Sequence, residues 1–170
     1  SHPEINEGRA LAFIDIPNSE GPEKPGRSMS RNIEATKISE DVVKILNKVP
    51  NATIGIISFY SAQVSLINDC LSSKINNEQK SQVEVGTGDA FQGKEYDYVL
   101  LSWVRSFKHN TQEKHSLEFL DKPNRLCVSF SRSKKQLAVY GDAQCLKPIE
   151  SINALYRVCA EHNGGYYHAL

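Results

Sequence analysis

Residues Thr53-Ile54-Gly55-Ile56-Ile57-Ser58-Phe59 form a short apolar run, and the stretch that follows, residues 61–75, carries a single helical stripe made of Val64, Ile67, Leu71 and Ile75. A short run with few polar residues is typical of a strand buried on both faces, and the i, i+3, i+4 spacing is typical of a helix with one side on a core. Together they predict a strand followed by a helical crossover, the repeating unit of a parallel α/β sheet.

The same alternation extends in both directions along the chain. We expect four further strands, at residues 10–16, 83–87, 96–104 and 136–140. Further helices are expected from Ser28 or Ser30, either of which could cap the helix, to Pro50, and at residues 124–133 and 149–162. A surface loop is expected at residues 18–27 and a flexible, charged insert at residues 106–122. The predicted fold is therefore α/β, with a mostly parallel sheet flanked by helices in one domain, residues 1–170.

Composition excludes several classes of protein. The chain has 170 residues, of which 39% are hydrophobic and 24% charged, and its 20 Lys and Arg balance its 20 Asp and Glu. A zero net charge means that any nucleic-acid contact must be local. The four cysteines form no CxxC pair, so neither a metal site nor a disulfide scaffold is expected. The absence of a long apolar run or a leader predicts a cytoplasmic or nuclear protein with no membrane contact.

Two polar segments carry chemistry. The first, residues 87–95, lies between two expected strands, where open α/β sheets hold ligands. In it, Gly93 allows close backbone approach, and Gln92 and Glu95 supply an amide and a carboxylate. In the second, residues 124–135, Arg125 and Arg132 are seven apart and share one helical face, from which they could reach a phosphate. Taken alone, the first segment could be a polar loop with a capping carboxylate, and the second a helix with a solvated basic end.

The order of these segments resembles motifs IV, V and VI of superfamily 1 helicases, above all the group that contains senataxin and the nonsense-mediated-decay helicase. The first likeness is Ile54 to Gln63. The second is Asp89-Ala90-Phe91-Gln92-Gly93-Lys94-Glu95, with Ser102-Trp103-Val104-Arg105 closing the next strand. The third is Arg125-Leu126-Cys127-Val128, then Ser129-Phe130-Ser131-Arg132-Ser133-Lys134, an apolar strand and Gly141. The resemblance spans nearly the whole chain and implies a RecA-like (P-loop NTPase-type) domain.

Some positions depart from the family pattern. Gly88 stands where an apolar residue is usual, Phe59 replaces a proline, and Ser58 and Ser131 replace threonines but keep the hydroxyl. Arg31 lies at the spacing from Glu34 where the family has asparagine. The chain contains no GxxxxGK[ST], so it lacks a Walker A loop of its own. Its first residue is Ser1 and its only methionine is Met29, which indicates a piece of a larger protein.

The resemblance implies that the chain is the second motor domain of an ATP-dependent helicase. Arg132 is then the catalytic arginine finger, and the ATP-binding residues are Gln92, Gly93, Glu95, Arg31 and Arg105, with Glu95 on the ribose. Single-stranded DNA or RNA would be contacted by Ser58, Tyr60, Gln63 and Thr87. For Tyr60 and Gln63, packing at a helix start is an equal alternative.

Partners and cofactors follow from the same resemblance. An upstream RecA-like domain in the same polypeptide would supply the Walker A lysine and the ligands of Mg²⁺, and ATP would bind between the two domains. The rival interpretation is a non-catalytic RecA-like module that binds nucleic acid or protein. The pairing of Arg132 with Glu95 favours the motor domain.

Overall fold

A computed structural model describes residues 10–106, 132–161 and 166–168. The strands are β1 Leu11–Asp15, β2 Ile54–Ser58, β3 Val83–Gly86, β4 Tyr96–Ser102, β5 Ser133–Gly141 and β6 Tyr166–His168. The helices are α1 Asn32–Lys48, α2 Ser61–Ser72, α3 Asn77–Lys80, α6 Ala143–Leu146 and α7 Glu150–Glu161. Two 3₁₀ turns complete the order, η1 Asn18–Glu20 and η2 Gly88–Phe91.

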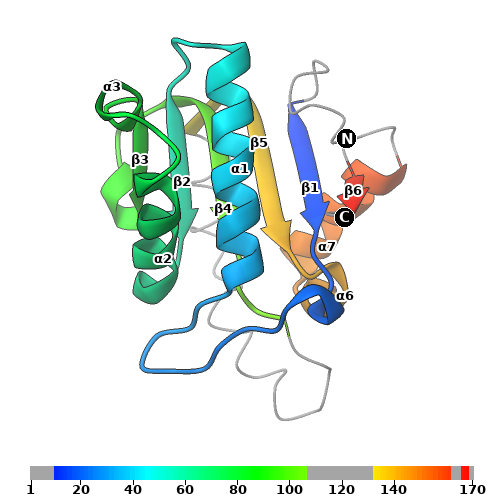
Figure 1. Ribbon diagram of the computed structural model, residues 1–170. Helices are drawn as coiled ribbons and strands as arrows, with labels where there is room; N and C mark the ends of the chain where they lie inside the picture. Colours follow the sequence, from blue (N-terminus) through cyan, green and yellow to red (C-terminus); the bar gives the residue numbers. More distant parts are fainter. Residues whose placement is uncertain (1–9, 107–131, 162–165, 169–170) are drawn as a thin grey trace.

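The strands form one sheet in the order β3-β2-β4-β5-β1-β6, and every pairing is parallel. Because all strands run the same way, the sheet has one edge of carboxyl ends and one edge of amino ends (Figure 1). The predicted α/β fold with a parallel sheet is confirmed. The five expected strands are present, and the sixth, β6, was not predicted because it has only three residues.

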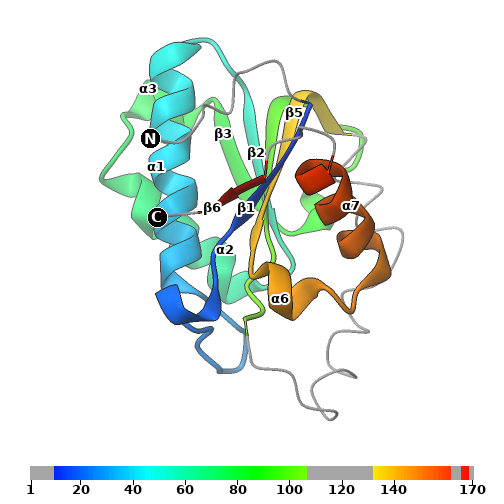
Figure 2. The ribbon, with the colours of Figure 1, turned by 90° about the vertical axis from the view of Figure 1, so that its right-hand side faces the viewer.

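Helices cover both faces of the sheet. In Figure 2, α1 and α2 lie on one side and α6 and α7 on the other. Alternate residues of each strand point to opposite cores, so that Ile54 and Ile56 of β2 join the core under α1 and α2, and Ile57 joins the other core. This double burial explains why the strands appear in the sequence as continuous apolar runs rather than as alternating patterns.

Several element boundaries differ from those expected. Neither Ser28 nor Ser30 caps α1: the N-cap residue is Arg31, with no side-chain capping bond. The Ser28 hydroxyl instead accepts a hydrogen bond from the Ala62 backbone N–H, 3.2 Å away, at the start of α2. Strand β5 begins at Ser133, not at residue 136, with an irregular register beside Tyr96 and Tyr98. Most of the helix expected at residues 124–133, Arg125 included, and of the insert expected at 106–122 lies outside the described residues.

Candidate functional site

The candidate residues lie at two edges of the sheet. Gln92, Gly93 and Glu95 precede β4, and Arg132 precedes β5, so these four are at the amino edge. The carboxyl edge carries the other six, which are Arg31, Ser58, Tyr60, Gln63, Thr87 and Arg105. Because β4 has seven residues, the two edges are separated by roughly 20 Å. The structure thus brings three of the five proposed ATP-binding residues together with Arg132, the proposed catalytic residue, and separates Arg31 and Arg105 from them.

At the amino edge, Glu95 and Arg132 directly precede two paired strands. The first paired residues of β4 and β5 are Tyr96 and Ser133, and each candidate is the residue just before. The Glu95 side chain is 59% exposed, and its nearest ion-pair partner is Lys134, with 3.6 Å between Nζ and Oε2. Arg132 is partly buried, and its Nε atom has no hydrogen-bond partner. A carboxylate and a guanidinium at one edge, both outside the core, can together serve a ligand that has hydroxyl and phosphate groups.

Residues 87–95 connect the two edges by crossing one face of the sheet. Thr87 follows β3 at the carboxyl edge, and η2 then leads back to the amino edge, where Gly93 adopts φ +74°. That backbone conformation is one that a residue with a Cβ rarely adopts. The same nine residues therefore supply a candidate nucleic-acid contact at one end and a candidate nucleotide contact at the other.

Aromatic packing fixes this crossing segment against the sheet. The Phe91 ring is fully buried and meets the Tyr96 ring at an angle of 64°, with 5.4 Å between centroids. Glycines make room for both rings. A Cβ at Gly55 would lie 2.8 Å from Cδ2 of Tyr96, and one at Gly86 would lie 3.3 Å from Cε2 of Phe91. Residues 88–95 are thus anchored by packing that the loop sequence alone does not reveal.

At the carboxyl edge, the candidates divide into accessible and buried side chains. Thr87 is exposed and Tyr60 partly exposed. Ser58 is fully buried, and its hydroxyl has no hydrogen-bond partner. Gln63 is also fully buried; its amide nitrogen donates to Ser102 Oγ at 3.1 Å, and its oxygen accepts from the backbone N–H of Arg31 at 2.8 Å. For Gln63, the structure favours packing at the helix start over a contact with single-stranded DNA or RNA.

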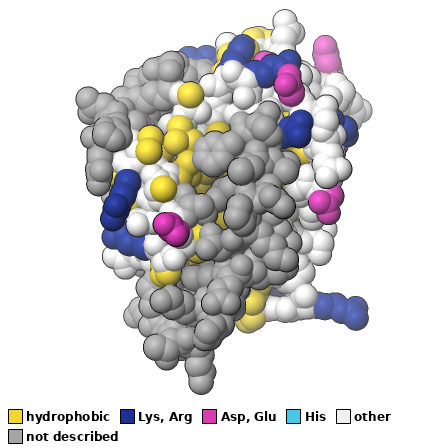
Figure 3. Space-filling model, turned by 180° about the vertical axis from the view of Figure 1, so that it is seen from behind, with side chains coloured by type: hydrophobic (Ala, Val, Ile, Leu, Met, Phe, Trp, Pro, Cys, Tyr) yellow, Lys and Arg dark blue, Asp and Glu magenta, His cyan; other side chains and the backbone are white. Residues whose placement is uncertain are grey.

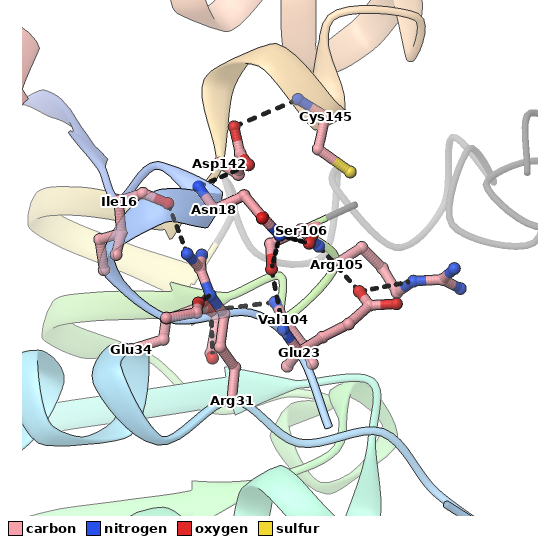
Figure 4. A network of polar contacts seen from close by, with 12 residues as sticks. Ile16, Asn18, Glu23, Arg31, Glu34, Val104, Arg105, Ser106, Asp142 and Cys145 are labelled. Atoms are coloured by element: carbon pink, nitrogen blue, oxygen red, sulfur yellow. Dashed lines mark hydrogen bonds and ion pairs between the residues drawn. The ribbon is translucent and has the colours of Figure 1, made fainter. Parts of the chain in front are cut away.

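Arg31 is part of the interior, contrary to the expectation that it contacts ATP. Its side chain has no exposed surface, and its Nη2 donates to the backbone oxygens of Ile16 and Pro17 at 2.7 and 2.9 Å. Its Nε donates to the oxygen of Gly21 at 2.7 Å, and Nη1 lies 3.5 Å from Glu34 (Figure 4). These contacts fasten the loop after β1 to the start of α1 and leave no face of the guanidinium for a ligand.

Glu34 is a buried residue near the carboxyl edge that the sequence analysis did not single out. Its carboxylate is fully buried and accepts from Ser102 Oγ at 2.5 Å and from the Val104 backbone N–H at 3.0 Å. Burial raises the pKa of Glu34, and the neighbouring Arg31 and these hydrogen bonds oppose the rise. Val104 has φ +70°, a strained conformation for a β-branched residue, and its bond to Glu34 stabilises it. The sequence signal for this ion pair was the three-residue spacing between Arg31 and Glu34.

Arg105 belongs to the same network of polar contacts and is largely buried, with 8% of its surface exposed. Its Nε is 3.0 Å from Glu23 Oε2, an oxygen that also accepts from the Ser106 backbone N–H at 2.7 Å (Figure 4). Burial lowers the pKa of Arg105, but hydrogen bonding to Tyr60 and the charge of Glu23 outweigh it, so the pKa is raised. Arg105 is therefore a permanent cation next to Tyr60 at the carboxyl edge.

One face of the molecule can be seen in the space-filling view. On the face that Figure 3 shows, the Lys and Arg side chains of the described residues lie in small groups, some of them next to Asp or Glu side chains. Among the described residues, no His, Cys, Asp and Glu side chains cluster as metal ligands would. Within the same part of the chain, no helix is long and apolar enough to span a membrane.

The fold and the segment order define a RecA-like helicase domain of superfamily 1, and comparison with known proteins agrees. Residues 2–144 match the family described as "AAA domain", and the chain belongs to that family. The chain resembles the "Helicase required for RNAi-mediated heterochromatin assembly 1" of Schizosaccharomyces pombe, with 38% identity over 65% of the chain and 11% of that protein.

Two further comparisons extend the likeness. "Regulator of nonsense transcripts 1" of Dictyostelium discoideum is 33% identical over 85% of the chain and 11% of its own length. The solved C-terminal domain of a possible DNA helicase from Lactobacillus plantarum has the same fold, with a TM-score of 0.55, 16% identity, and coverage of 97% of this chain and 89% of that one. The chain spans about a tenth of the curated relatives.

Proposed function

We propose that this chain is the second motor domain of an ATP-dependent helicase, and that it completes a nucleotide site begun by an upstream RecA-like domain. The observation that carries the proposal is the position of Glu95 and Arg132 at the start of two paired strands. Both side chains lie outside the two cores, at one edge of a rigid sheet. A second domain facing this edge would enclose the nucleotide between the two domains.

Each residue at the amino edge has a separate task in this proposal. The Glu95 carboxylate accepts hydrogen bonds from the ribose hydroxyls, and Gly93 lets the nucleotide approach the backbone beside Gln92. Arg132 stabilises the charge that develops on the transferring phosphoryl group. Arg132 is only partly buried, so its side chain is accessible to an anionic ligand. In this proposal the Mg²⁺ ligands are supplied by the upstream domain.

The carboxyl edge would hold the single strand of DNA or RNA. Thr87 is exposed there, and Tyr60 and the cation of Arg105 lie in contact with one another, so these three side chains are the proposed contacts. A hydroxyl, a phenol and a guanidinium suit phosphates and unpaired bases. In this proposal Arg105 contacts the single-stranded nucleic acid, whereas the sequence analysis expected it to contact ATP. Closure of the two domains on ATP would then shift the strand-binding edge relative to the upstream domain.

The test compares the chain alone with the full-length protein. ATP hydrolysis is measured for each, with and without single-stranded DNA and single-stranded RNA in separate arms. We expect no turnover by residues 1–170 and turnover by the full-length protein that one or both strands stimulate. The double variant Thr87→Ala, Tyr60→Ala should weaken that stimulation when the concentration of the single-stranded nucleic acid is limiting. Turnover by the chain alone, or a full-length protein that binds the strand without hydrolysing ATP, contradicts the proposal; the latter result indicates a non-catalytic binding module.

A further inference from the structure

The residues on either side of Glu95 are held by one carboxylate on another strand. Glu84 of β3 accepts a hydrogen bond from Lys94 Nζ at 2.8 Å through Oε1. Its second oxygen, Oε2, accepts from the hydroxyl of Tyr96. Lys94 and Tyr96 are the neighbours of Glu95 in the chain, so Glu84 contacts the residue on each side of Glu95. The contact with Tyr96 is the more buried of the two, since the Lys94 side chain is 53% exposed.

The reach of Tyr96 to Glu84 depends on a glycine in the strand between them. Tyr96 begins β4, β2 lies between β4 and β3, and Glu84 pairs in register with Gly55 of β2. The Tyr96 ring packs over Gly55, where a Cβ would lie only 2.8 Å from the ring. The ring thus spans one whole strand, and the hydroxyl at its far end meets Glu84.

Electrostatics keep both partners in the form that this contact needs. Hydrogen bonds from Lys94 and Tyr96 lower the pKa of Glu84 despite the opposing effect of burial. Burial, and next the hydrogen bond to Glu84, raise the pKa of Tyr96. At neutral pH, Glu84 is therefore an anionic acceptor and Tyr96 a neutral donor. Charge-assisted bonds of this kind are the stronger ones.

Glu95 itself has little else to fix it. Its side chain is exposed, and the 3.6 Å ion pair with Lys134 joins two exposed groups, a kind of contact that contributes little. On the other side of Lys94, Gly93 sits at φ +74°. We propose that Glu84 is a positioning residue that sets the Glu95 carboxylate for the ribose by holding Lys94 and Tyr96. This inference rests on the proposed function, since it gives Glu84 a role only if Glu95 binds the nucleotide.

The experiment is a double-mutant cycle in the full-length protein, with ATP as the probe and both kcat and KM measured. We expect Glu84→Gln to raise KM for ATP roughly tenfold, the size of one weakened charge-assisted hydrogen bond, with kcat within about twofold. In a Glu95→Ala background the same change should have little further effect, because Glu84 acts through Glu95. Tyr96→Phe and Lys94→Met should each produce part of the rise in KM.

The control is Glu40→Gln, which removes an exposed carboxylate from α1 on the opposite face of the sheet. Thermal unfolding of each variant shows whether the fold is kept. An unchanged KM in Glu84→Gln, or an equal rise in KM in the presence and absence of the Glu95 carboxylate, overturns the inference and leaves the motor-domain proposal standing. If Glu95→Ala and Arg132→Ala both leave ATP hydrolysis unchanged, the proposed function fails, and the role of Glu84 fails with it.

Discussion

Glu95 and Arg132 hold the same position on neighbouring strands: each is the residue before the first paired residue, Tyr96 in β4 and Ser133 in β5. Paired strands lie about 5 Å apart, so a rigid element fixes the spacing of the two backbones. In the proposed function, the amino edge of the sheet presents the Glu95 carboxylate and the Arg132 guanidinium to one nucleotide.

Arg31 should matter for stability and not for contact with ATP. In Arg31→Met, the Glu34 carboxylate stays buried without its cation, and three backbone oxygens lose their donor. Removing one partner of a buried pair typically costs about 3–5 kcal/mol. Urea unfolding of the chain measures the loss, with Arg27→Met in the exposed loop as the matched control. Unchanged stability together with a higher KM for ATP in the full-length protein would restore Arg31 to the nucleotide site.

The buried carboxylate of Glu34 gives stability a defined pH dependence. Because burial raises its pKa in the folded state, the folded protein holds this proton more tightly than the unfolded chain does. Its contribution is therefore fully present below the unfolded value, 4.5, and is lost as pH rises through the folded value. The difference in unfolding free energy between the wild type and Glu34→Gln should fall over that window. A difference that is constant or that grows with pH contradicts the expected sign.

Gly55 should be intolerant of a methyl group, because the rings that anchor residues 87–95 occupy its Cβ position. In Gly55→Ala the new atom would lie 2.8 Å from the Tyr96 ring and 3.1 Å from the Phe91 ring. Overpacking of this kind costs about 1–3 kcal/mol. Gly88→Ala is the control, since its Cβ would meet Phe59 at an ordinary 3.7 Å. Thermal unfolding compares the two variants. Equal midpoints would show that the space at the Gly55 Cβ position is not tightly packed.

Much of the fold is predictable from the sequence, because doubly buried strands leave apolar runs that Gly, Pro and polar residues bound. The five expected strands follow from this pattern, as do α1, α2 and α7. Strand β6 is too short to leave a periodic signal. The start of α1 was misplaced because serine is a common N-cap, whereas here Arg31 takes that position and Ser28 serves α2.

The candidate site was predictable in its residue types and only partly in its arrangement. Segment order grouped Arg31 with Glu95, but tertiary contacts separate them: Arg31 finds its acceptors in the loop after β1, distant in sequence. Gln63 is likewise buried, and it forms hydrogen bonds with Arg31 and Ser102. Glu84 left no local signal at all, because its partners are ten and twelve residues further along the chain, and one of them, Tyr96, meets it across Gly55.

The most direct test of the account is the turnover number of Arg132→Ala in the full-length protein at saturating ATP and single strand. We expect kcat to fall by about 10³- to 10⁵-fold, the usual contribution of an arginine finger, with an unchanged thermal midpoint. Lys135→Ala, an exposed cation three residues further on in the same strand region, should leave kcat unaltered. If Arg132→Ala hydrolyses ATP as fast as the wild type, Arg132 does not face the phosphoryl group and the shared nucleotide site does not exist.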